Sequence, residues 1–154
     1  MPQNPSSLHR RRLLSGSALA AAGLAGWTRG ADPSVQEMSV KSWINSPNPD
    51  SAQRKTGPVQ IHGVAFGGLD AIRRVEVTLD GGKSWRDARF VGPDLGRYAW
   101  RQFALMAHLP AGNHLLASRA TDAAGKVQPP QRFESAGGYN NTSWLDHAVQ
   151  AMVA

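Results

Sequence analysis

Short apolar runs that alternate strictly with polar residues, each ended by a turn sequence, constrain the fold of this chain more than any other feature. Residues 72–79 show the pattern best, because Val75, Val77 and Leu79 alternate with polar residues. A period of two places the apolar side chains on one face of a β-strand. Asp80-Gly81-Gly82 then supplies the positive φ angles of a tight hairpin turn. The segment is therefore predicted to be a strand that enters a hairpin.

The same pattern recurs through most of the chain after residue 39. Turn residues separate the apolar runs, and the 16 Gly and 10 Pro argue against long helices. About seven short strands at regular spacing predict an all-β fold, an immunoglobulin-like β-sandwich. The expected strands are residues 40–44, 59–66 and 72–79, a return strand that contains Trp85 and Phe90, and residues 98–107, 114–122 and 143–153.

The first 31 residues have the composition of an export signal. Arg10-Arg11-Arg12 precede residues 13–26, a weakly hydrophobic run rich in Ala and Gly. A basic segment followed by such a run is how export signals are built, and the run is too short for a stable membrane span. The arginine pair, one variable residue and Leu13-Leu14 resemble a twin-arginine leader. An ordinary secretory leader and an amphipathic helix on a membrane surface are the alternatives.

These features divide the chain into three parts. We expect a cleavable export signal in residues 1–31, a linker in residues 32–38 and a single folded domain in residues 39–154. The cleavage site stays open, because no clean Ala-x-Ala sequence stands just before Asp32. The expected location is the periplasm.

The net charge of +6 reflects the leader more than the folded part. Four arginines precede Ala31, which leaves 13 basic residues against 11 acidic ones in the rest of the chain. A nucleic-acid-binding protein carries a basic stripe in its folded part, and no such stripe is visible here. The chain also has no Cys, which excludes disulfides, a cysteine nucleophile, thiolate-bound zinc and iron–sulfur clusters.

Candidate site residues are few. His62, His114 and His147 fall on separate predicted strands and lack the local spacing of metal ligands, so we expect solvated or hydrogen-bonded side chains. Asp80 and Asp122 are candidates for acid–base chemistry, but both fall in turn sequences that explain them. We therefore assign no catalytic, cofactor-binding or metal-binding residue.

Two surface features allow more than one interpretation. Arg73-Arg74, with Arg86 and Arg89, can form a basic patch for an anionic partner or a solvated hairpin edge. Charged residues protect edge strands from aggregation, which favours the second interpretation. Asn140-Asn141-Thr142 has the pattern of a glycosylation acceptor, and we interpret it as part of a loop.

Four ordered blocks of sequence, preceded by an entry strand at residues 38–44, resemble one known domain. The blocks are Gly63-Val64-Ala65-Phe66, residues 72–85, Tyr98-Ala99-Trp100-Arg101 and residues 119–129. Together they resemble the C-terminal dimerisation domain of the sulfite oxidase family, over about residues 39–149. In physical terms, Trp85 is expected to fold back over the hairpin, and Trp100 to anchor the core between the sheets. Asp122 and Gly125 are expected to form a turn, and Arg119 to pair with Asp122 or another acid or to lie on a sheet face.

The resemblance implies a domain that pairs with its own copy. It also implies a molybdenum–pterin cofactor, held in these enzymes by a separate, preceding domain through a cysteine thiolate. A substrate-binding arginine of the family follows a Trp near the end of the domain, where this chain has Trp144-Leu145-Asp146. Because that position carries Asp146, no catalytic residue is transferred.

We expect this chain to lack the cofactor domain, since only residues 32–38 separate the leader from the dimerisation domain. An internal deletion or a split or misread gene would produce such a chain. The resulting function is a non-catalytic dimerisation module that binds no cofactor itself and forms a homodimer. The alternatives are a subunit acting in trans with a molybdenum enzyme, and a free-standing periplasmic binding module that uses loops 47–57 or 133–142. Independent oxidoreductase activity ranks lowest.

Overall fold

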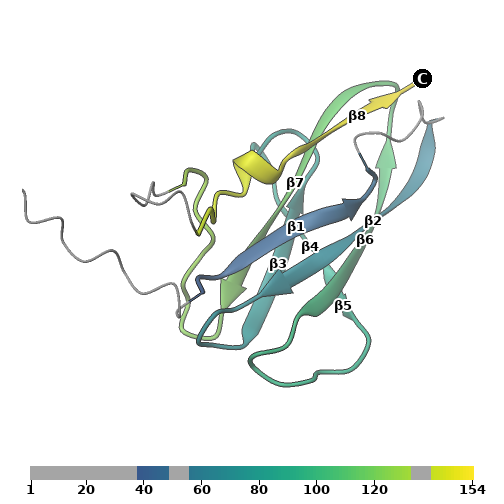
Figure 1. Cartoon of the computed structure of the whole chain (residues 1–154). Coiled ribbons are helices and arrows are strands. Elements are labelled where there is room, and N and C mark those ends of the chain that lie inside the picture. The colour runs from purple at the N-terminus through teal and green to yellow at the C-terminus, as the bar shows by residue number, and fades with distance from the viewer. Residues whose placement is uncertain (1–37, 49–55, 133–139) are drawn as a thin grey trace, which may run out of the picture. The chain divides into compact units, whose positions relative to one another are not determined.

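The computed structural model describes residues 38–48, 56–132 and 140–154, which form two antiparallel four-stranded sheets (Figure 1). The first, called the β2–β6 sheet below, has the order β1-β2-β6-β5. Its strands are β1 (Lys41–Ser46), β2 (Gly57–Phe66), β6 (Arg101–Leu109) and β5 (Arg89–Val91). The second, the β3–β7 sheet, has the order β4-β3-β7-β8. Its strands are β4 (Arg86–Asp87), β3 (Ile72–Thr78), β7 (Gly112–Asp122) and β8 (Val149–Val153).

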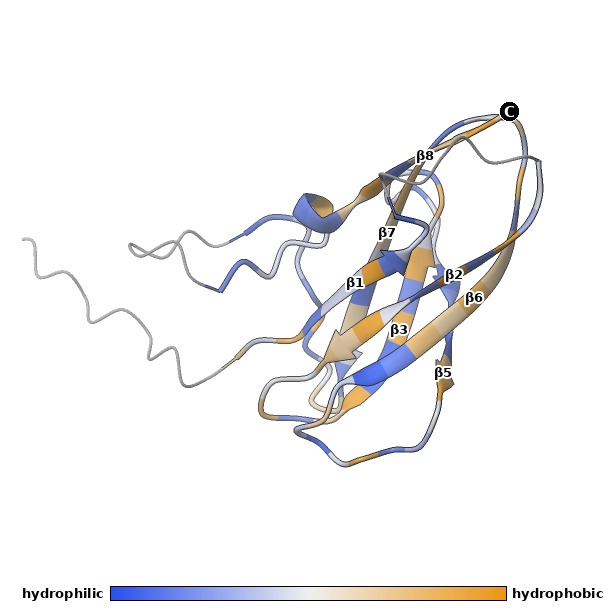
Figure 2. Ribbon diagram, turned by 45° about the vertical axis from the view of Figure 1, so that its right-hand side comes forward, coloured by the Kyte–Doolittle hydropathy of each residue, from blue (hydrophilic) through white to orange (hydrophobic). Residues whose placement is uncertain are grey.

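The predicted all-β, immunoglobulin-like sandwich is confirmed. The described residues contain no α-helix, only the 3₁₀ turn η1 (Leu145–His147) before β8. Apolar side chains of both sheets fill the space between them, and Figure 2 shows the alternation of apolar and polar residues along β3. The core is formed by Val40, Ile44, Val59, Ile61, Ala65, Ile72, Val75, Val77, Phe103, Ala107, Leu109, Leu116, Ala120, Val149, Ala151 and Val153.

The expected return strand is divided between the two sheets. In β4, Asp87 pairs with Glu76 of β3, whereas in β5, Arg89 pairs with Ala104 of β6. Ala88 lies between the two short strands, and its N–H donates to the carbonyl of Val75 over 2.9 Å. The chain therefore changes sheets within this segment, and the described residues form eight strands where about seven were expected.

The other strand boundaries follow the predictions closely, except for two starts. The strand expected from residue 98 begins at Arg101, after a turn in which the N–H of Ala99 donates to the carbonyl of Gly96. The strand expected from residue 143 begins at Val149. Residues just before it form η1, and the hydroxyl of Ser143 accepts a hydrogen bond from the N–H of Asp146 over 3.0 Å. A serine hydroxyl that binds the backbone this way favours a turn over a strand.

Both turn predictions are confirmed. Gly81 and Gly82 have φ angles of 73° and 94°, in the region that glycine adopts without strain. The Asp80 carboxylate accepts hydrogen bonds from the N–H and the hydroxyl of Ser84, over 2.9 and 2.6 Å. In the second turn, Asp122 accepts from the N–H of Lys126 over 2.8 Å, and Gly125 has a φ of 87°.

A buried glutamine, Gln128, joins the two sheets. It binds β1, an edge strand of the β2–β6 sheet, and β7, a central strand of the β3–β7 sheet. The Oε1 atom of Gln128 accepts hydrogen bonds from the N–H of Ser42 over 2.8 Å and from the N–H of Ala120 over 3.2 Å. Its Nε2 atom donates to the carbonyl of Ser42 over 3.2 Å. The side-chain amide thus takes the place of a strand between β1 and β7 and satisfies backbone groups that neither sheet pairs.

A glycine lets β1 lie close to β2. A Cβ atom at Gly63 would lie 2.1 Å from the carbonyl oxygen of Trp43 and 2.6 Å from Cζ of Phe103. The position therefore admits no side chain, because the Phe103 ring and the β1 backbone occupy that space.

Candidate interface

Side chains alternate along each strand of the β2–β6 sheet between the core and the outer face. The outer face is therefore formed by the residues that lie between the core positions. Cross-strand partners point to the same side of a sheet. Gln60 stands opposite Met106, and His62 stands opposite Ala104, in the pairing of β2 with β6. Trp43 stands opposite Val64 in the pairing of β1 with β2. These side chains face away from the core.

Three aromatic side chains form a cluster at one end of this outer face. The ring of Trp100 lies 5.0 Å from that of Trp43, edge to face, and 5.1 Å from that of Phe66. Trp100 remains 43% exposed although two rings support it. We call Trp43, Phe66 and Trp100 the aromatic cluster.

The prediction that Trp100 anchors the core between the sheets is wrong. Trp100 shares its parity with Gln102 and Ala104, and both of those face outward in the pairing with β2. The inward position belongs to Phe103, which is fully buried. Aromatic content identified the strand, but the side that each ring occupies depends on where the strand starts.

The outer face of the β2–β6 sheet is poor in charge. None of its four strands contains an Asp or Glu. Its outward-facing cations, Lys41 and Arg89, belong to β1 and β5, the two edge strands. The central positions carry amide, imidazole and thioether side chains instead, at Gln60, Gln102, His62 and Met106.

Lys41 and His147 lie beside the aromatic cluster. The Nζ atom of Lys41 stands 5.6 Å from the centre of the Trp43 ring, and the His147 ring is 6.3 Å from the same ring. Burial lowers the pKa of Lys41. Burial also lowers the pKa of His147, and the nearby positive charge of Lys41 lowers it further. Both groups are thus held in surroundings that disfavour positive charge.

The outer face of the β3–β7 sheet is charged, and its charges are paired with one another. Arg74 binds Asp87 and Glu76, with N–O distances of 2.6 Å to each, and Arg119 binds Glu76 over 2.8 Å. The hydrogen bond to Asp87 raises the pKa of Arg74. The Arg119 guanidinium also stands 4.2 Å from the centre of the Trp85 ring. Arg119 therefore pairs with another acid, one of the expected arrangements, and not with Asp122.

Trp85 and Trp144 cover part of this charged face. Their rings lie 5.1 Å apart, edge to face. Trp144 also lies against the hairpin, since a Cβ atom at Gly82 would be 2.7 Å from its Cη2 atom. Trp85 thus contacts Trp144 and Arg119, and Trp144, from the segment before η1, is the ring that lies against the hairpin.

The four arginines considered as a basic patch do not form one surface. Arg74 and Arg86 belong to the β3–β7 sheet, whereas Arg89 belongs to the β2–β6 sheet. Arg74 is paired with two carboxylates. The arrangement fits a solvated edge better than a site for an anion.

The histidines are spread over the domain. His62 is exposed on β2, His114 lies 2.9 Å from the carbonyl of Pro110, and His147 belongs to η1. Among the residues that the structure describes, no group of three or more His, Cys, Asp or Glu side chains could hold a metal ion. Asp146, predicted from the sequence to occupy the position of the family's substrate-binding arginine, accepts a hydrogen bond from the side-chain amide of Asn141 over 2.9 Å.

Several expectations concern segments outside the described residues. The leader at residues 1–31 lies there, as do most of loops 47–57 and 133–142. No helix in the described ranges is long and apolar enough to cross a membrane.

The family described as the Mo-co oxidoreductase dimerisation domain matches residues 32–152. The chain belongs to this family. The resemblance to the dimerisation domain of sulfite oxidases is thereby confirmed. Mitochondrial sulfite oxidase of Homo sapiens is 40% identical over 103 residues, which cover 63% of this chain and 19% of that protein. Inducible nitrate reductase [NADH] 2 of Glycine max is 29% identical over 132 residues, 77% of this chain and 15% of that protein.

A solved structure shares the fold. The sulfane dehydrogenase SoxCD from Paracoccus pantotrophus superposes with a TM-score of 0.58 at 34% identity, covering 76% of this chain and 33% of that chain. The chain spans about a fifth of the length of the curated sulfite oxidases that it matches, 19% in the human protein. The similarity thus covers only the part of these proteins that corresponds to the dimerisation domain.

The residues present do not fit a molybdenum–pterin site. The chain has no Cys to supply a thiolate ligand, and the described residues offer no cluster of other ligating side chains. Thiolate is the protein ligand that the family resemblance implies for this metal.

Proposed function

We propose that this chain is a dimerisation module of a molybdenum oxidoreductase similar to sulfite oxidase, and that it carries out no redox chemistry itself. One observation carries the proposal. The match to the family's dimerisation domain extends over residues 32–152, whereas the chain supplies no thiolate for the cofactor. The proposed activity of the domain is association through its surface, and the outer faces of the two sheets are the candidate surfaces.

The test is the oligomeric state of the full chain in solution. We expect a homodimer by light scattering and sedimentation at concentrations up to about 100 µM, where a dissociation constant in the low micromolar range gives mostly dimer. A chain that remains monomeric over this range would contradict the proposal. The measurement needs no cofactor, since association is the proposed activity.

A second candidate function is a subunit that acts in trans with a cofactor-bearing chain. The observation that favours it is the match to a dimerisation domain of molybdenum oxidoreductases in a sequence that has no Cys to ligate the metal. Recovery of the tagged chain from its own cells, with molybdenum measured in the eluate, separates the two. Molybdenum together with a larger chain favours the subunit, and a metal-free homodimer favours the isolated module.

The proposal includes export to the periplasm by residues 1–31. Its support is the run of arginines at residues 10–12 before a mild, Ala- and Gly-rich segment. A reporter fused behind residues 1–31 is expected in the periplasm, and Arg10→Lys with Arg11→Lys is expected to hold it in the cytoplasm. A reporter exported equally well with both lysines would exclude the twin-arginine route but leave export itself standing.

A further inference from the structure

We propose that a second copy of this chain binds to the outer face of the β2–β6 sheet, over the aromatic cluster and Met106. This inference rests on the proposed dimerisation function and adds the surface on which it occurs. The surface runs from the aromatic cluster at the end of β1 and β2 along the centre of β6.

Exposed apolar side chains mark this face. Trp100 is 43% exposed and Met106 is 54% exposed. Trp100 is supported by Trp43 and Phe66, at ring distances of 5.0 and 5.1 Å, so its ring is already held in one orientation. Ordering a side chain before binding lowers the entropy lost in the complex. Aromatic side chains and Met are enriched at protein interfaces, and a supported Trp is the usual type of hot spot.

The charge of the face suits a second copy. In a dimer with twofold symmetry the same surface meets itself, so like charges at its centre would face each other. The four strands contain no Asp or Glu, and the outward-facing cations Lys41 and Arg89 stand on the two edge strands. The neutral centre can therefore be buried against its own copy without placing like charges in contact.

The opposite face is less suited to association. Its carboxylates and guanidinium groups already bind one another, from Asp87 through Arg74 and Glu76 to Arg119. Trp85 and Trp144 cover part of it. A partner placed there would remove solvent from charges that gain no new partner, at a cost that apolar contacts must offset.

The size of the face is adequate for a small stable interface. The strands β1, β2, β6 and β5 have 6, 10, 9 and 3 residues. At a rise of about 3.4 Å per residue and a strand spacing of about 4.8 Å they give a flat area of roughly 450 Å². Projecting side chains raise the accessible area above that footprint, towards the roughly 800 Å² per partner of a standard interface. An interface of this size would therefore bury most of the outer face of the sheet, including Gln60 and His62 beside Met106.

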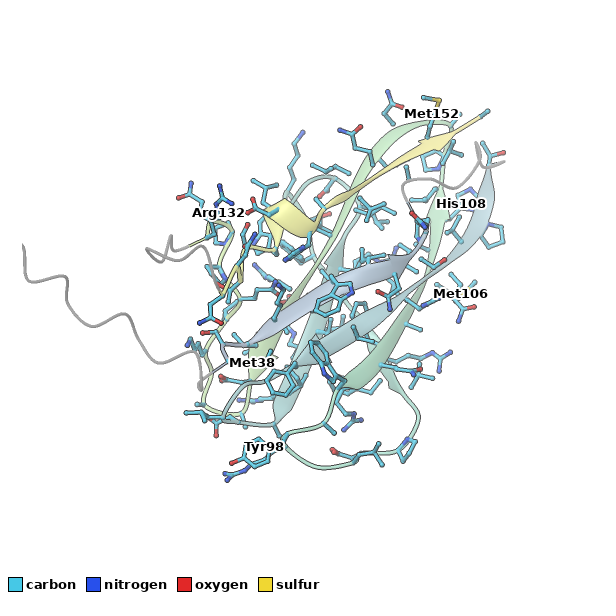
Figure 3. The ribbon with its side chains drawn as sticks, viewed as in Figure 1. Met38, Tyr98, Met106, His108, Arg132 and Met152 are labelled. Atoms are coloured by element: carbon cyan, nitrogen blue, oxygen red, sulfur yellow. The ribbon has the colours of Figure 1, made fainter. Side chains whose placement is uncertain are left out.

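Two exposed methionines provide matched test variants. Met106 projects from β6 on the proposed interface, and Met152, 59% exposed, projects from β8 on the other sheet (Figure 3). Met106→Asp places a carboxylate in the centre of a face that has none. Burying two such carboxylates in one dimer is expected to weaken association about 100-fold or more. Met152→Asp makes the same chemical change outside the face, and the dimer is expected to persist.

The experiment is sedimentation equilibrium of the full chain and both variants from about 1 to about 100 µM, with circular dichroism to check that each is folded. Dimeric wild type, monomeric Met106→Asp and dimeric Met152→Asp support the inference. A dimer that survives Met106→Asp overturns it while leaving the proposed function intact. A wild-type chain that is monomeric throughout overturns both.

Hydrogen exchange gives an independent readout should Met106→Asp fail to fold. Comparing the wild type at high and low concentration, we expect slower exchange in the dimer at exposed residues of β6 and β2, and unchanged exchange in β8. Protection confined to β8 or to the outer face of β3 and β7 would contradict the proposed surface.

Discussion

At the residue scale, Gln128 shows how one buried side chain can hold two sheets together. Gln128→Leu keeps the apolar volume but leaves the N–H and carbonyl of Ser42 and the N–H of Ala120 without their side-chain partner. Each unpaired buried group costs about 1–3 kcal/mol, so we expect the free energy of unfolding to fall by at least about 3 kcal/mol. Urea denaturation measures it. Gln150→Leu, at an exposed position of β8, is the control and should change the midpoint little.

His147 predicts how stability depends on pH. Its Nε2 atom is buried without a hydrogen-bond partner in the described part of the chain, and burial and Lys41 lower its pKa from 6.5. Below that value the unfolded chain binds a proton that the folded chain disfavours. Stability should therefore fall as the pH drops through 6.5 and stop falling below the folded pKa. Above 6.5 this group should have no effect.

His147→Phe isolates this contribution, because it keeps an aromatic ring and removes the titration. Urea denaturation between about pH 7.5 and about pH 5 should show a smaller loss of stability in the variant than in the wild type. Every other titratable group is present in both proteins, so the difference between the two pH profiles reports the contribution of His147. Parallel pH profiles would show that His147 accepts its proton freely in the folded state.

The positions of individual side chains were predictable from the sequence where a local backbone turn determines them. Asp80 and Asp122 occupy their expected turns, because a short acidic side chain next to glycine has few other ways to satisfy the local N–H groups. The hydrogen bonds from Ser84 and Thr78 also lower the pKa of Asp80. Trp100 was misplaced because its side of the sheet depends on strand parity, and the start of β6 was not predictable to the residue.

At the element scale, the hairpin after β3 depends on its contact with the segment before η1. Gly82 and Gly96 have similar φ angles, 94° and 98°. A Cβ atom at Gly82 would lie 2.7 Å from Trp144, whereas nothing lies within 4 Å at Gly96. Both changes to Ala strain the backbone by about 1–2 kcal/mol. Only Gly82→Ala must also displace Trp144, which adds about 1–3 kcal/mol.

The comparison of Gly82→Ala with Gly96→Ala therefore measures the packing of Trp144 and not backbone strain. Urea denaturation should give the larger loss for Gly82→Ala. Near-ultraviolet circular dichroism should change for that variant alone, since it moves Trp144 against Trp85. Equal losses for the two variants would mean that Trp144 moves aside without cost.

Strand positions were predictable to within a few residues because each is an apolar run between turn residues. The divided return strand was not, since β4 and β5 are too short to show a period of their own. Ala88 leaves a single residue between them. Pairing decides the sheet to which each short strand belongs. Arg86 of β4 pairs with Val77 of β3, and Phe90 of β5 pairs with Phe103 of β6.

At the scale of the whole molecule, the sequence identified a two-sheet domain but not the surface that associates. Alternation marks one inner and one outer face on each sheet, and it gives no ranking of the two outer faces. The ranking depends on pairs formed across strands, such as Glu76 with Arg119 on one sheet and the aromatic cluster on the other. Only the folded arrangement shows that the charges of one face are already paired.

Association also predicts how thermal stability depends on concentration. Binding that favours the folded state raises the melting temperature as the protein concentration increases. Trp100 lies in the proposed interface and outside the core. Trp100→Ser should therefore prevent dimer formation, and the melting temperature of this variant should not depend on concentration. Towards the lowest concentrations, where the wild type is monomeric, the two melting temperatures should approach each other. A Trp100→Ser variant that melts several degrees lower even there would indicate a structural role within the monomer. Calorimetry or tryptophan fluorescence, repeated over a dilution series, makes the measurement.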